Sequence, residues 1–172
     1  PAGSRVQSVH LGQLNRVLEH SPEDLTVIVE AGCPLASLQQ TLAARGQWLP
    51  IDPPPPEQLT VGALLDTNAS GPRRCGHGTI RAHLIGIRVA LPDGRLIRSG
   101  GKVVKNVAGY DLLKLFVGAR GTLGIVVEAT FKLLPLPESE NFVQHSCASL
   151  EEAETLLDQG RESELTPTVL DL

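Results

Sequence analysis

The sequence predicts an α+β fold, and three observations support this. Segment 35–42 places leucines at helical spacing, directly after a proline and shortly before a glycine. Segment 84–91 has apolar residues at alternate positions and is followed by Pro-Asp-Gly, which is a typical hairpin turn. The alternation returns over 125–133, after which two prolines stand close together. One segment thus has the period of a helix, and the other two have the period of half-buried strands.

The first half of the chain is predicted to alternate strands and helices, separated by loops. Pro34 stands where the first helical position should be, and Gly46 stands where that helix should end. The four prolines of segment 53–56 cannot enter a helix interior or a central strand. We interpret them as a rigid connector, with a docking ligand for a partner as the alternative. The expected elements, in order, are a strand at 4–10, a loop with one helical turn at 11–20, a strand at 25–31, a helix at 34–45 and a helix at 60–69.

The second half is predicted to contain a hairpin, a short helix, a long strand and then a strand–helix–strand unit. Asp111 is an expected N-cap, because its side chain can accept hydrogen bonds from the free N–H groups of a first helical turn. Ser149 and Glu152 form the pattern of a capping box, and Gly160 is expected to end the helix that follows. The expected elements, in order, are strands at 84–91 and 95–99, a short helix from 111, a strand at 125–133, a strand at 141–147, a helix from 150 and a strand at 165–172.

Two of these elements have a face that we expect to be buried. In the short helix this face consists of Leu112, Leu115 and Phe116, which follow helical spacing. In the long strand it consists of every second residue, with a charged or hydroxyl side chain at several positions between them. The strand residues expected in the core are Ile125, Val127, Ala129, Phe131 and Leu133.

Glycine recurs at every third position between the short helix and the long strand, at Gly118, Gly121 and Gly124. This spacing gives the backbone freedom for positive φ angles or for close approach to another surface. One interpretation is a tight helix-to-strand connection that only needs small residues. The other is that the segment from Gly121 to Gly124 lets a ligand lie against its backbone N–H groups.

The composition indicates a globular domain and excludes several classes of function. The chain has 172 residues, 41% of them hydrophobic, with a mean hydropathy of +0.02, which suffices for one domain with a core. A net charge of −4 and a pI near 5.7 argue against a nucleic-acid-binding or anionic-membrane surface. No run reaches the roughly 18 apolar residues of a transmembrane helix. The cysteines, Cys33, Cys75 and Cys147, form neither a C-x-x-C pair nor an even framework, which favours a reducing compartment and no zinc site.

Two adjacent motifs resemble a known flavoprotein family. KNVAGYDL (Lys105–Leu112) followed by VGARGTLGIVVE (Val117–Glu128) resembles the matching segment of the FAD-binding domain shared by the vanillyl-alcohol oxidase and p-cresol methylhydroxylase (PCMH) flavoproteins. More narrowly, these motifs resemble the FAD-binding subunit of bacterial glycolate oxidase, as does SGPRR (Ser70–Arg74). The wider family has a serine and a glutamate where Ala119 and Arg120 stand here, so the resemblance implies backbone contacts rather than side-chain contacts at these positions.

The resemblance implies a PCMH-type FAD-binding domain over residues 1–137, made of its second subdomain and part of the first. Residues 138–172 then form the beginning of a substrate-binding cap. No glycine-rich loop for the pyrophosphate precedes the first strand, and the chain begins PAGSRVQSV without an initiator methionine. We therefore expect a fragment that lacks the N-terminal part of the FAD-binding domain.

The same resemblance implies which positions contact FAD, through backbone groups and small hydroxyls. These positions are Pro50, Thr60, Val61, Gly62, Asn68, Ser70, Gly71, Gly78, Thr79, Gly121, Thr122, Gly124, Ile125 and Val126. We expect Gly62 and Gly71 to permit close approach, and Ile125 to use its backbone because its side chain belongs to the buried face. Arg73 and Arg74 are interpreted as solvated charges, and His77 as a polar or packing residue. No catalytic residue is assigned and no metal site is expected, since the five histidines form no cluster.

The function implied by the resemblance is that of a glycolate-oxidase-like 2-hydroxy-acid dehydrogenase, with FAD carrying electrons from glycolate or D-lactate to another acceptor. The fragment alone is expected to be inactive. The implied partners are the other glycolate oxidase subunits, a second flavin subunit and an iron–sulfur subunit, in the cytoplasm or peripherally at the inner membrane. Two alternatives stay open: a non-catalytic subunit that keeps the flavin fold for structural reasons, and a fragment of a single-polypeptide D-lactate dehydrogenase.

Overall fold

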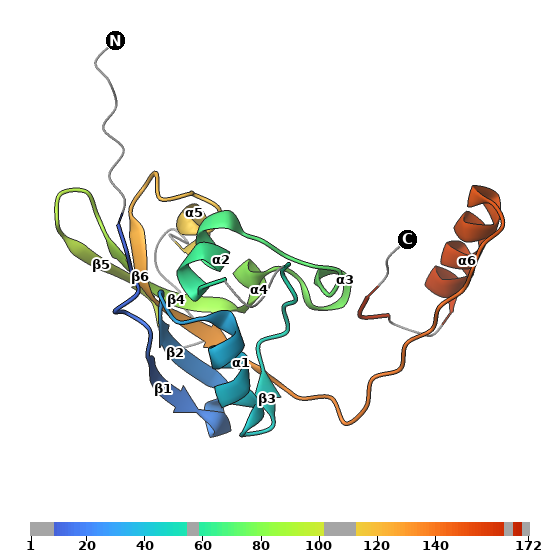
Figure 1. Ribbon diagram of the computed structural model, residues 1–172, viewed down its shortest axis with the longest axis horizontal. Coiled ribbons are helices and arrows are strands. Elements are labelled where there is room, and N and C mark those ends of the chain that lie inside the picture. The colour runs from blue at the N-terminus through green and yellow to red at the C-terminus, as the bar shows by residue number, and fades with distance from the viewer. Residues whose placement is uncertain (1–8, 55–58, 102–112, 164–166, 170–172) are drawn as a thin grey trace, which may run out of the picture.

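The computed structural model in Figure 1 describes residues 9–54, 59–101, 113–163 and 167–169. Several predictions fall outside these ranges. They are most of the strand at 4–10, the N-cap at Asp111, the core position Leu112 and most of the strand at 165–172. The described residues at the edges of those two predicted strands, 9–10 and 167–169, are not in strands.

The centre of the fold is an antiparallel sheet, which has the strand order β1-β2-β6-β4-β5 within the described residues. Every neighbouring pair in this order is antiparallel. Strand β6 lies in the middle and pairs with β2 on one side and β4 on the other. The strand bounds are β1 Val17–Ser21, β2 Thr26–Glu30, β4 Leu84–Ala90, β5 Leu96–Gly100 and β6 Ile125–Lys132, with a separate pair formed by β3 Gln47–Trp48 and β7 Leu134–Pro135.

Short helices cover one face of the sheet, as Figure 1 shows. Helix α2 packs on β6 and β2, and α5 packs on β4. The core between helices and sheet is apolar, and its largest side chains, among them Leu38, Leu42, Leu64 and Phe131, are fully buried. The helix bounds are α1 Leu35–Ala43, α2 Val61–Thr67, α3 Arg74–His77, α4 Ile80–His83, α5 Leu113–Phe116 and α6 Leu150–Glu162, with a 3-10 turn η1 at Pro22–Asp24.

The α+β class and several elements are confirmed. Strand β2 lies in the predicted range 25–31, and α1 follows Pro34 and ends before Gly46. Helix α2 lies in the range 60–69, and Thr60 is its N-cap. The hairpin formed by β4 and β5 turns at Pro-Asp-Gly as expected, with Gly94 at φ 83°. These elements have strong local signals, and their packing agrees with them.

The predictions for two segments are wrong. Segment 11–20 contains β1 rather than a loop with a helical turn, and segment 141–147 contains no strand. β1 is an edge strand with a register break between Val17 and Glu19, so its alternation of buried and exposed residues is weak. Segment 141–147 has apolar residues at Phe142 and Val143, but these side chains are 84% and 90% exposed and pair with no sheet.

The capping box of α6 is confirmed, but the predicted end of that helix is wrong. The Ser149 hydroxyl accepts the N–H of Glu152 at 3.2 Å, and the Glu152 carboxylate accepts the N–H of Ala148 at 2.7 Å. Gly160 lies inside the helix, which continues to Glu162 because glycine is tolerated within a helix near its end. In Figure 1, α6 stands apart from the sheet at the end of an extended segment.

The buried faces of two elements differ from those predicted. Strand β6 has a bulge between its pairings Arg88–Glu128 and Val89–Val126, which adds one residue and reverses the alternation. Val126 is therefore buried, whereas Ile125 and Val127 are only partly buried; Ala129, Phe131 and Leu133 are buried as predicted. In α5, Phe116 is buried but Leu115 is 56% exposed, because a helix of one turn has only a narrow inner face.

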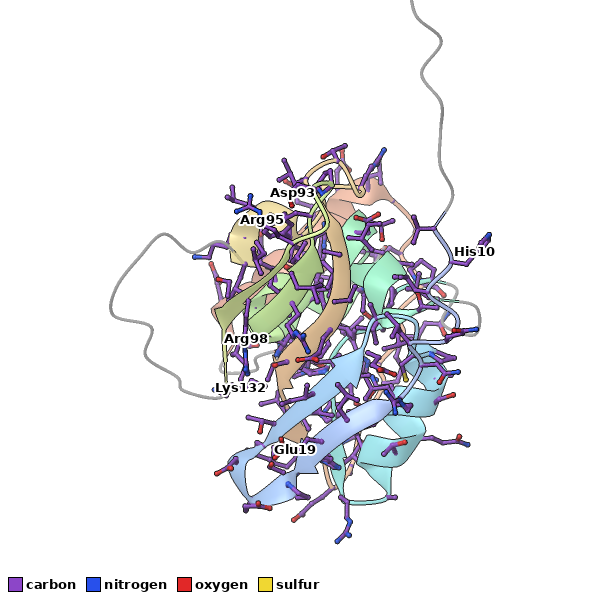
Figure 2. All side chains as sticks on the ribbon, turned by 90° about the vertical axis from the view of Figure 1, so that its left-hand side faces the viewer. His10, Glu19, Asp93, Arg95, Arg98 and Lys132 are labelled. Atoms are coloured by element: carbon purple, nitrogen blue, oxygen red, sulfur yellow. The ribbon has the colours of Figure 1, made fainter. Side chains whose placement is uncertain are left out.

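The other face of the sheet carries charged residues. Arg88 on β4 lies opposite Arg98 on β5 and forms an ion pair with Glu128 on β6 at 3.2 Å. Figure 2 looks onto the strands and shows Arg98 and Lys132 among these side chains. The carboxylate of Glu128 thus neutralises the positive charge of one of two arginines that lie opposite each other on neighbouring strands.

Candidate functional site

Helix α2 begins at a fully hydrogen-bonded N-terminus. The Thr60 hydroxyl accepts the N–H of Ala63 at 3.2 Å, and the Thr60 carbonyl accepts the N–H of Leu64 at 2.9 Å. The N–H groups of Val61 and Gly62 donate to carbonyl oxygens just after β2, at 2.9 and 2.6 Å. This helix start therefore uses its N–H groups within the chain and keeps none of the first four to bind an anion.

Gly62 and Gly71 are in close contact with the chain itself. A Cβ atom on Gly62 would lie 3.0 Å from the carbonyl oxygen of Ala31, and one on Gly71 would overlap the carbonyl and carboxylate oxygens of Asp52. Both positions therefore need glycine for packing. Their contact with a cofactor stays a prediction, since packing alone explains the residue type.

The C-terminal end of α2 has hydrogen-bonding groups that find no partner within the described residues. Asn68 ends the helix in the left-handed conformation, at φ 52°. Its side-chain Oδ1 is buried and has no hydrogen-bond partner in that part of the protein. Across the same ranges, the N–H groups of Ala69, Ser70 and Gly71 also donate to no acceptor. A buried oxygen without a donor costs about 1–3 kcal/mol, so this end of α2 has the properties of a binding surface.

The glycine-rich turn of residues 118–124 lies against this same end of α2. The N–H of Gly118 donates to the Leu65 carbonyl at 2.8 Å, and the N–H of Arg120 donates to the Asp66 carbonyl at 3.1 Å. The N–H of Gly121 donates to Asp66 Oδ1 at 2.5 Å. Gly118, Arg120 and Gly121 all have positive φ angles, of 81°, 51° and 71°. The expectation of positive φ in this turn is thus confirmed, and Arg120 adds a non-glycine residue to it.

Some hydrogen-bonding groups of this turn bond to one another. Both the N–H and the hydroxyl of Thr122 donate to the Ala119 carbonyl, at 3.1 and 2.6 Å. In the described part of the protein, the N–H groups of Leu123 and Gly124 donate to no acceptor. The main-chain donors of the turn that remain for a ligand are therefore the N–H groups of residues 123 and 124.

The remaining predicted residues lie around these two segments. Gly124 packs against Val89 and Ala90 at the end of β4, so Ile125 and Val126 begin β6 next to that strand. Pro50 is buried and precedes Asp52, whose carboxylate accepts the N–H of Arg73 at 3.1 and 3.2 Å. Gly78, at φ 79°, ends α3, and Thr79 precedes α4. The structure thus places Pro50 near the loop after α2, and places residues 118–121 near the end of α2.

A cluster that the sequence did not predict adjoins this loop. The Arg73 guanidinium lies 4.8 Å from the centre of the Trp48 ring and forms two hydrogen bonds with the Glu140 carboxylate, at 2.6 and 2.9 Å. The His77 ring meets Trp48 edge-on, with ring centres 5.5 Å apart. The interpretation of Arg73 as a solvated charge is therefore wrong, and His77 packs as expected. Trp48 and Glu140 lie 25 and 67 residues from Arg73, so no local pattern could reveal the cluster.

No described residue stands out as a catalytic acid or base. His83 is buried, which lowers the pKa of its imidazole, and its Nε2 lies 2.9 Å from the His77 carbonyl oxygen. In the described ranges, no three His, Cys, Asp or Glu residues are placed to hold a metal ion. A cleft of about 360 Å³ opens beside Leu35, Ile51 and Pro53, but the predicted FAD contacts do not line it.

Comparison with known proteins identifies the family. The model of the FAD binding domain family matches residues 3–100. The chain is 42% identical to glycolate oxidase subunit GlcD of Bacillus subtilis over 74% of this chain, and 37% identical to glycolate oxidase subunit GlcE of Escherichia coli over 80% of this chain. It is 34% identical to the mitochondrial D-lactate dehydrogenase [cytochrome] of Arabidopsis thaliana over 76% of this chain.

A solved structure has the same fold. Alkyldihydroxyacetonephosphate synthase superposes with a TM-score of 0.73 over 91% of this chain and 28% of its own, at 27% identity. The chain spans 27% of the length of GlcD and 39% of the length of GlcE. The predicted PCMH-type fold and the predicted cofactor, FAD, are confirmed by these matches. The chain belongs to the FAD binding domain family, and it is similar to the subunits of bacterial glycolate oxidase.

Proposed function

We propose that the chain is the FAD-binding portion of a glycolate-oxidase-like 2-hydroxy-acid dehydrogenase. The carrying observation is its similarity to glycolate oxidase subunits and to D-lactate dehydrogenases at 34–42% identity, because glycolate and D-lactate are both small 2-hydroxy acids. The whole protein would oxidise such an acid and pass the electrons to a further acceptor. Residues 1–137 belong to the FAD-binding domain in this proposal, and residues 138–172 begin the substrate-binding cap.

The end of α2 and the turn 118–124 fit the polar edge of a flavin cofactor. FAD presents both hydrogen-bond donors and acceptors, so it needs acceptors and donors from the protein. Asn68 Oδ1 is a buried acceptor that lacks a partner among the described residues, and the unused N–H groups of 69–71 and of 123–124 are donors. In the proposal, these groups hold the cofactor, together with the backbone around Gly78 and Thr79. The α2 N-terminus does not fit the pyrophosphate, since its N–H groups are used.

Bound FAD supplies the two-electron acceptor for the oxidation. The contribution of this chain is to bind and orient that group. Asn68 and the segment 69–71 fix one edge of the cofactor site, and the turn 118–124 fixes another through main-chain groups.

The proposed partners are those of a multi-subunit oxidase. The relatives GlcD and GlcE are named as subunits of glycolate oxidase. We extend this to a second flavin subunit and an iron–sulfur subunit that would receive the electrons, located in the cytoplasm or peripherally at the inner membrane. Among the helices that the structure describes, none has the length and apolar character of a membrane span.

A flavin titration followed by an activity assay tests this function. The purified 172-residue chain is titrated with FAD while the flavin absorption and fluorescence are recorded. Saturable binding with a shifted flavin band supports the proposal, and absence of binding contradicts it for this chain. The whole protein, purified with its associated subunits, is then assayed for dye reduction with glycolate and D-lactate. A flavin-loaded protein that reduces no dye with either acid supports the structural alternative instead.

A further inference from the structure

Asp66 holds the turn 118–124 against α2, at a position where a carboxylate is otherwise unfavourable. It is the last residue but one of α2, and the negative end of the helix dipole disfavours an acidic side chain there. Its Oδ1 accepts the N–H of Gly121 at 2.5 Å, and its carbonyl accepts the N–H of Arg120 at 3.1 Å. A side chain that opposes a local preference is expected to have a compensating role, and the hydrogen bond from the N–H of Gly121 to Oδ1 provides one.

The turn needs such support because its backbone conformation is costly. Arg120 has φ 51°, which costs a residue with a side chain about 1–2 kcal/mol relative to ordinary conformations. Its neighbours Gly118 and Gly121 adopt positive φ more readily. A conformation of this kind persists only where the surroundings determine it. The Asp66 carbonyl accepts the N–H of Arg120, and its carboxylate accepts the N–H of Gly121, so the side chain supports the strained residue through the peptide group that follows it.

The same residue joins the two segments that our proposal assigns to FAD. Asp66 precedes Asn68 by two positions, and the sequence distance from Asp66 to Gly121 is 55 residues. A Cβ atom on Gly118 would lie 3.5 Å from the Cβ of Asn68, so the turn directly adjoins the Asn68 amide. Two segments that bind one ligand must keep a fixed relative position, since a small misplacement reduces affinity strongly.

We propose that Asp66 is a positioning residue, which sets the turn 118–124 relative to Asn68 and residues 69–71 so that both segments bind the same FAD molecule. This inference rests on the proposed FAD-binding function. It assigns Asp66 no contact with the cofactor. The effect of its side chain passes through the N–H of Gly121, and therefore depends on the acceptor oxygen rather than on the charge.

The test compares three variants of the 172-residue chain. Asp66→Ala removes the acceptor, whereas Asp66→Asn keeps an acceptor oxygen at the same place without the charge. Arg81→Ala is the matched control, because Arg81 forms another long-range side-chain hydrogen bond, from α4 to the Lys114 carbonyl at 2.7 Å, and this acceptor lies outside the turn. FAD dissociation constants are measured by calorimetry, and hydrogen exchange of the turn is measured without FAD.

We expect Asp66→Ala to weaken FAD binding about tenfold, which corresponds to the loss of one hydrogen bond. Its turn should exchange faster, while Asp66→Asn and Arg81→Ala bind FAD within about threefold of the unmodified chain. Unchanged FAD affinity in Asp66→Ala overturns the inference and leaves the proposed function intact. So does an equal loss in Asp66→Ala and Arg81→Ala, which would indicate general destabilisation. If the unmodified chain binds no FAD, the proposed function fails and the inference fails with it.

Discussion

Arg73 and Glu140 form a bidentate ion pair that joins the loop after α2 to the extended segment before α6. The Arg73 side chain is 24% exposed and also lies over the ring of Trp48. Trp48 in turn donates its indole N–H to the carbonyl of Pro135, at the start of the same extended segment. The proposed cap is thus held to the FAD-binding domain at Glu140 by the Arg73 guanidinium, which also packs on the Trp48 ring.

The first prediction concerns Trp48, which is the only tryptophan in the sequence and therefore reports on this contact. Glu140→Gln should increase acrylamide quenching of Trp48 fluorescence, because Arg73 loses its charged partner and is held less firmly over the ring. Glu151→Gln, an exposed acidic residue in the first turn of α6, is the control and should leave quenching unchanged. Equal quenching in the unmodified protein and both variants would show that the ion pair does not hold Arg73 over the Trp48 ring.

The same contact should respond to acid in the unmodified protein. The Arg73 hydrogen bonds hold the pKa of the Glu140 carboxyl below its ordinary value of 4.5. The folded state therefore resists protonation more than the unfolded state does, so the pair contributes above pH 4.5 and is lost as the pH falls through the lowered pKa. Trp48 quenching should rise below pH 4.5 in the unmodified protein and should already be high at pH 7 in Glu140→Gln. Trp48 quenching that changes with pH in neither the unmodified protein nor Glu140→Gln would contradict this prediction.

The second carboxylate with a lowered pKa is Glu30, at the end of β2. Its side chain is 7% exposed and accepts three hydrogen bonds from Arg16, at 2.8, 2.9 and 3.1 Å. These bonds lower the pKa of the Glu30 carboxyl, so its stabilising effect is present above pH 4.5 and lost in more acidic solution. Arg16→Ala should lower the urea midpoint at pH 7 and flatten the loss of stability below pH 4.5.

The control for Arg16 is Arg95→Ala. Arg95 also pairs with a carboxylate, that of Asp93 at 2.6 Å, but both side chains are exposed at the hairpin tip, as Figure 2 shows. Exposed pairs contribute little to stability. If the urea midpoint falls equally in both variants, or falls in neither variant, the burial of Glu30 does not increase the contribution of its ion pair to stability.

The fourth prediction concerns the core. Phe131 on β6 is fully buried among the side chains of the main core, so Phe131→Ala should reduce the free energy of unfolding by about 3–5 kcal/mol. Phe142 is 84% exposed, and Phe142→Ala should change the free energy of unfolding by less than about 0.5 kcal/mol. Urea denaturation of both variants measures the difference. A large loss in Phe142→Ala would mean that this side chain packs against the rest of the protein in solution.

The sequence predicts those parts of the fold whose signals are local. Helix α1 follows from leucine spacing between a proline and a glycine, and the β4–β5 hairpin follows from its turn residues. The bulge in β6 cannot be read from the sequence, because Val126 and Val127 are equally apolar and only the pairing with β4 decides which is buried. β1 is missed because it is an edge strand with a register break, so its alternation of buried and exposed residues is weak.

The candidate site was predictable to a similar extent. The glycine turn and the α2 segment are recognisable by motif, and the structure places them together. The residues that join distant parts of the chain were not predictable. Asp66 binds a residue 55 positions away and Arg73 binds one 67 positions away, so neither partner has a sequence signal.

The last prediction separates packing from binding at Gly71. A Cβ atom there would overlap the carbonyl and carboxylate oxygens of Asp52, which also hold the N–H of Arg73. Gly71→Ala should therefore destabilise the apo protein by about 1–3 kcal/mol, because a buried loop must move. Gly12→Ala is the control, since a Cβ atom at Gly12 meets nothing within 4 Å. Urea denaturation without FAD is the measurement, and Gly71→Ala as stable as Gly12→Ala would show that glycine stands at position 71 for a ligand instead of for Asp52.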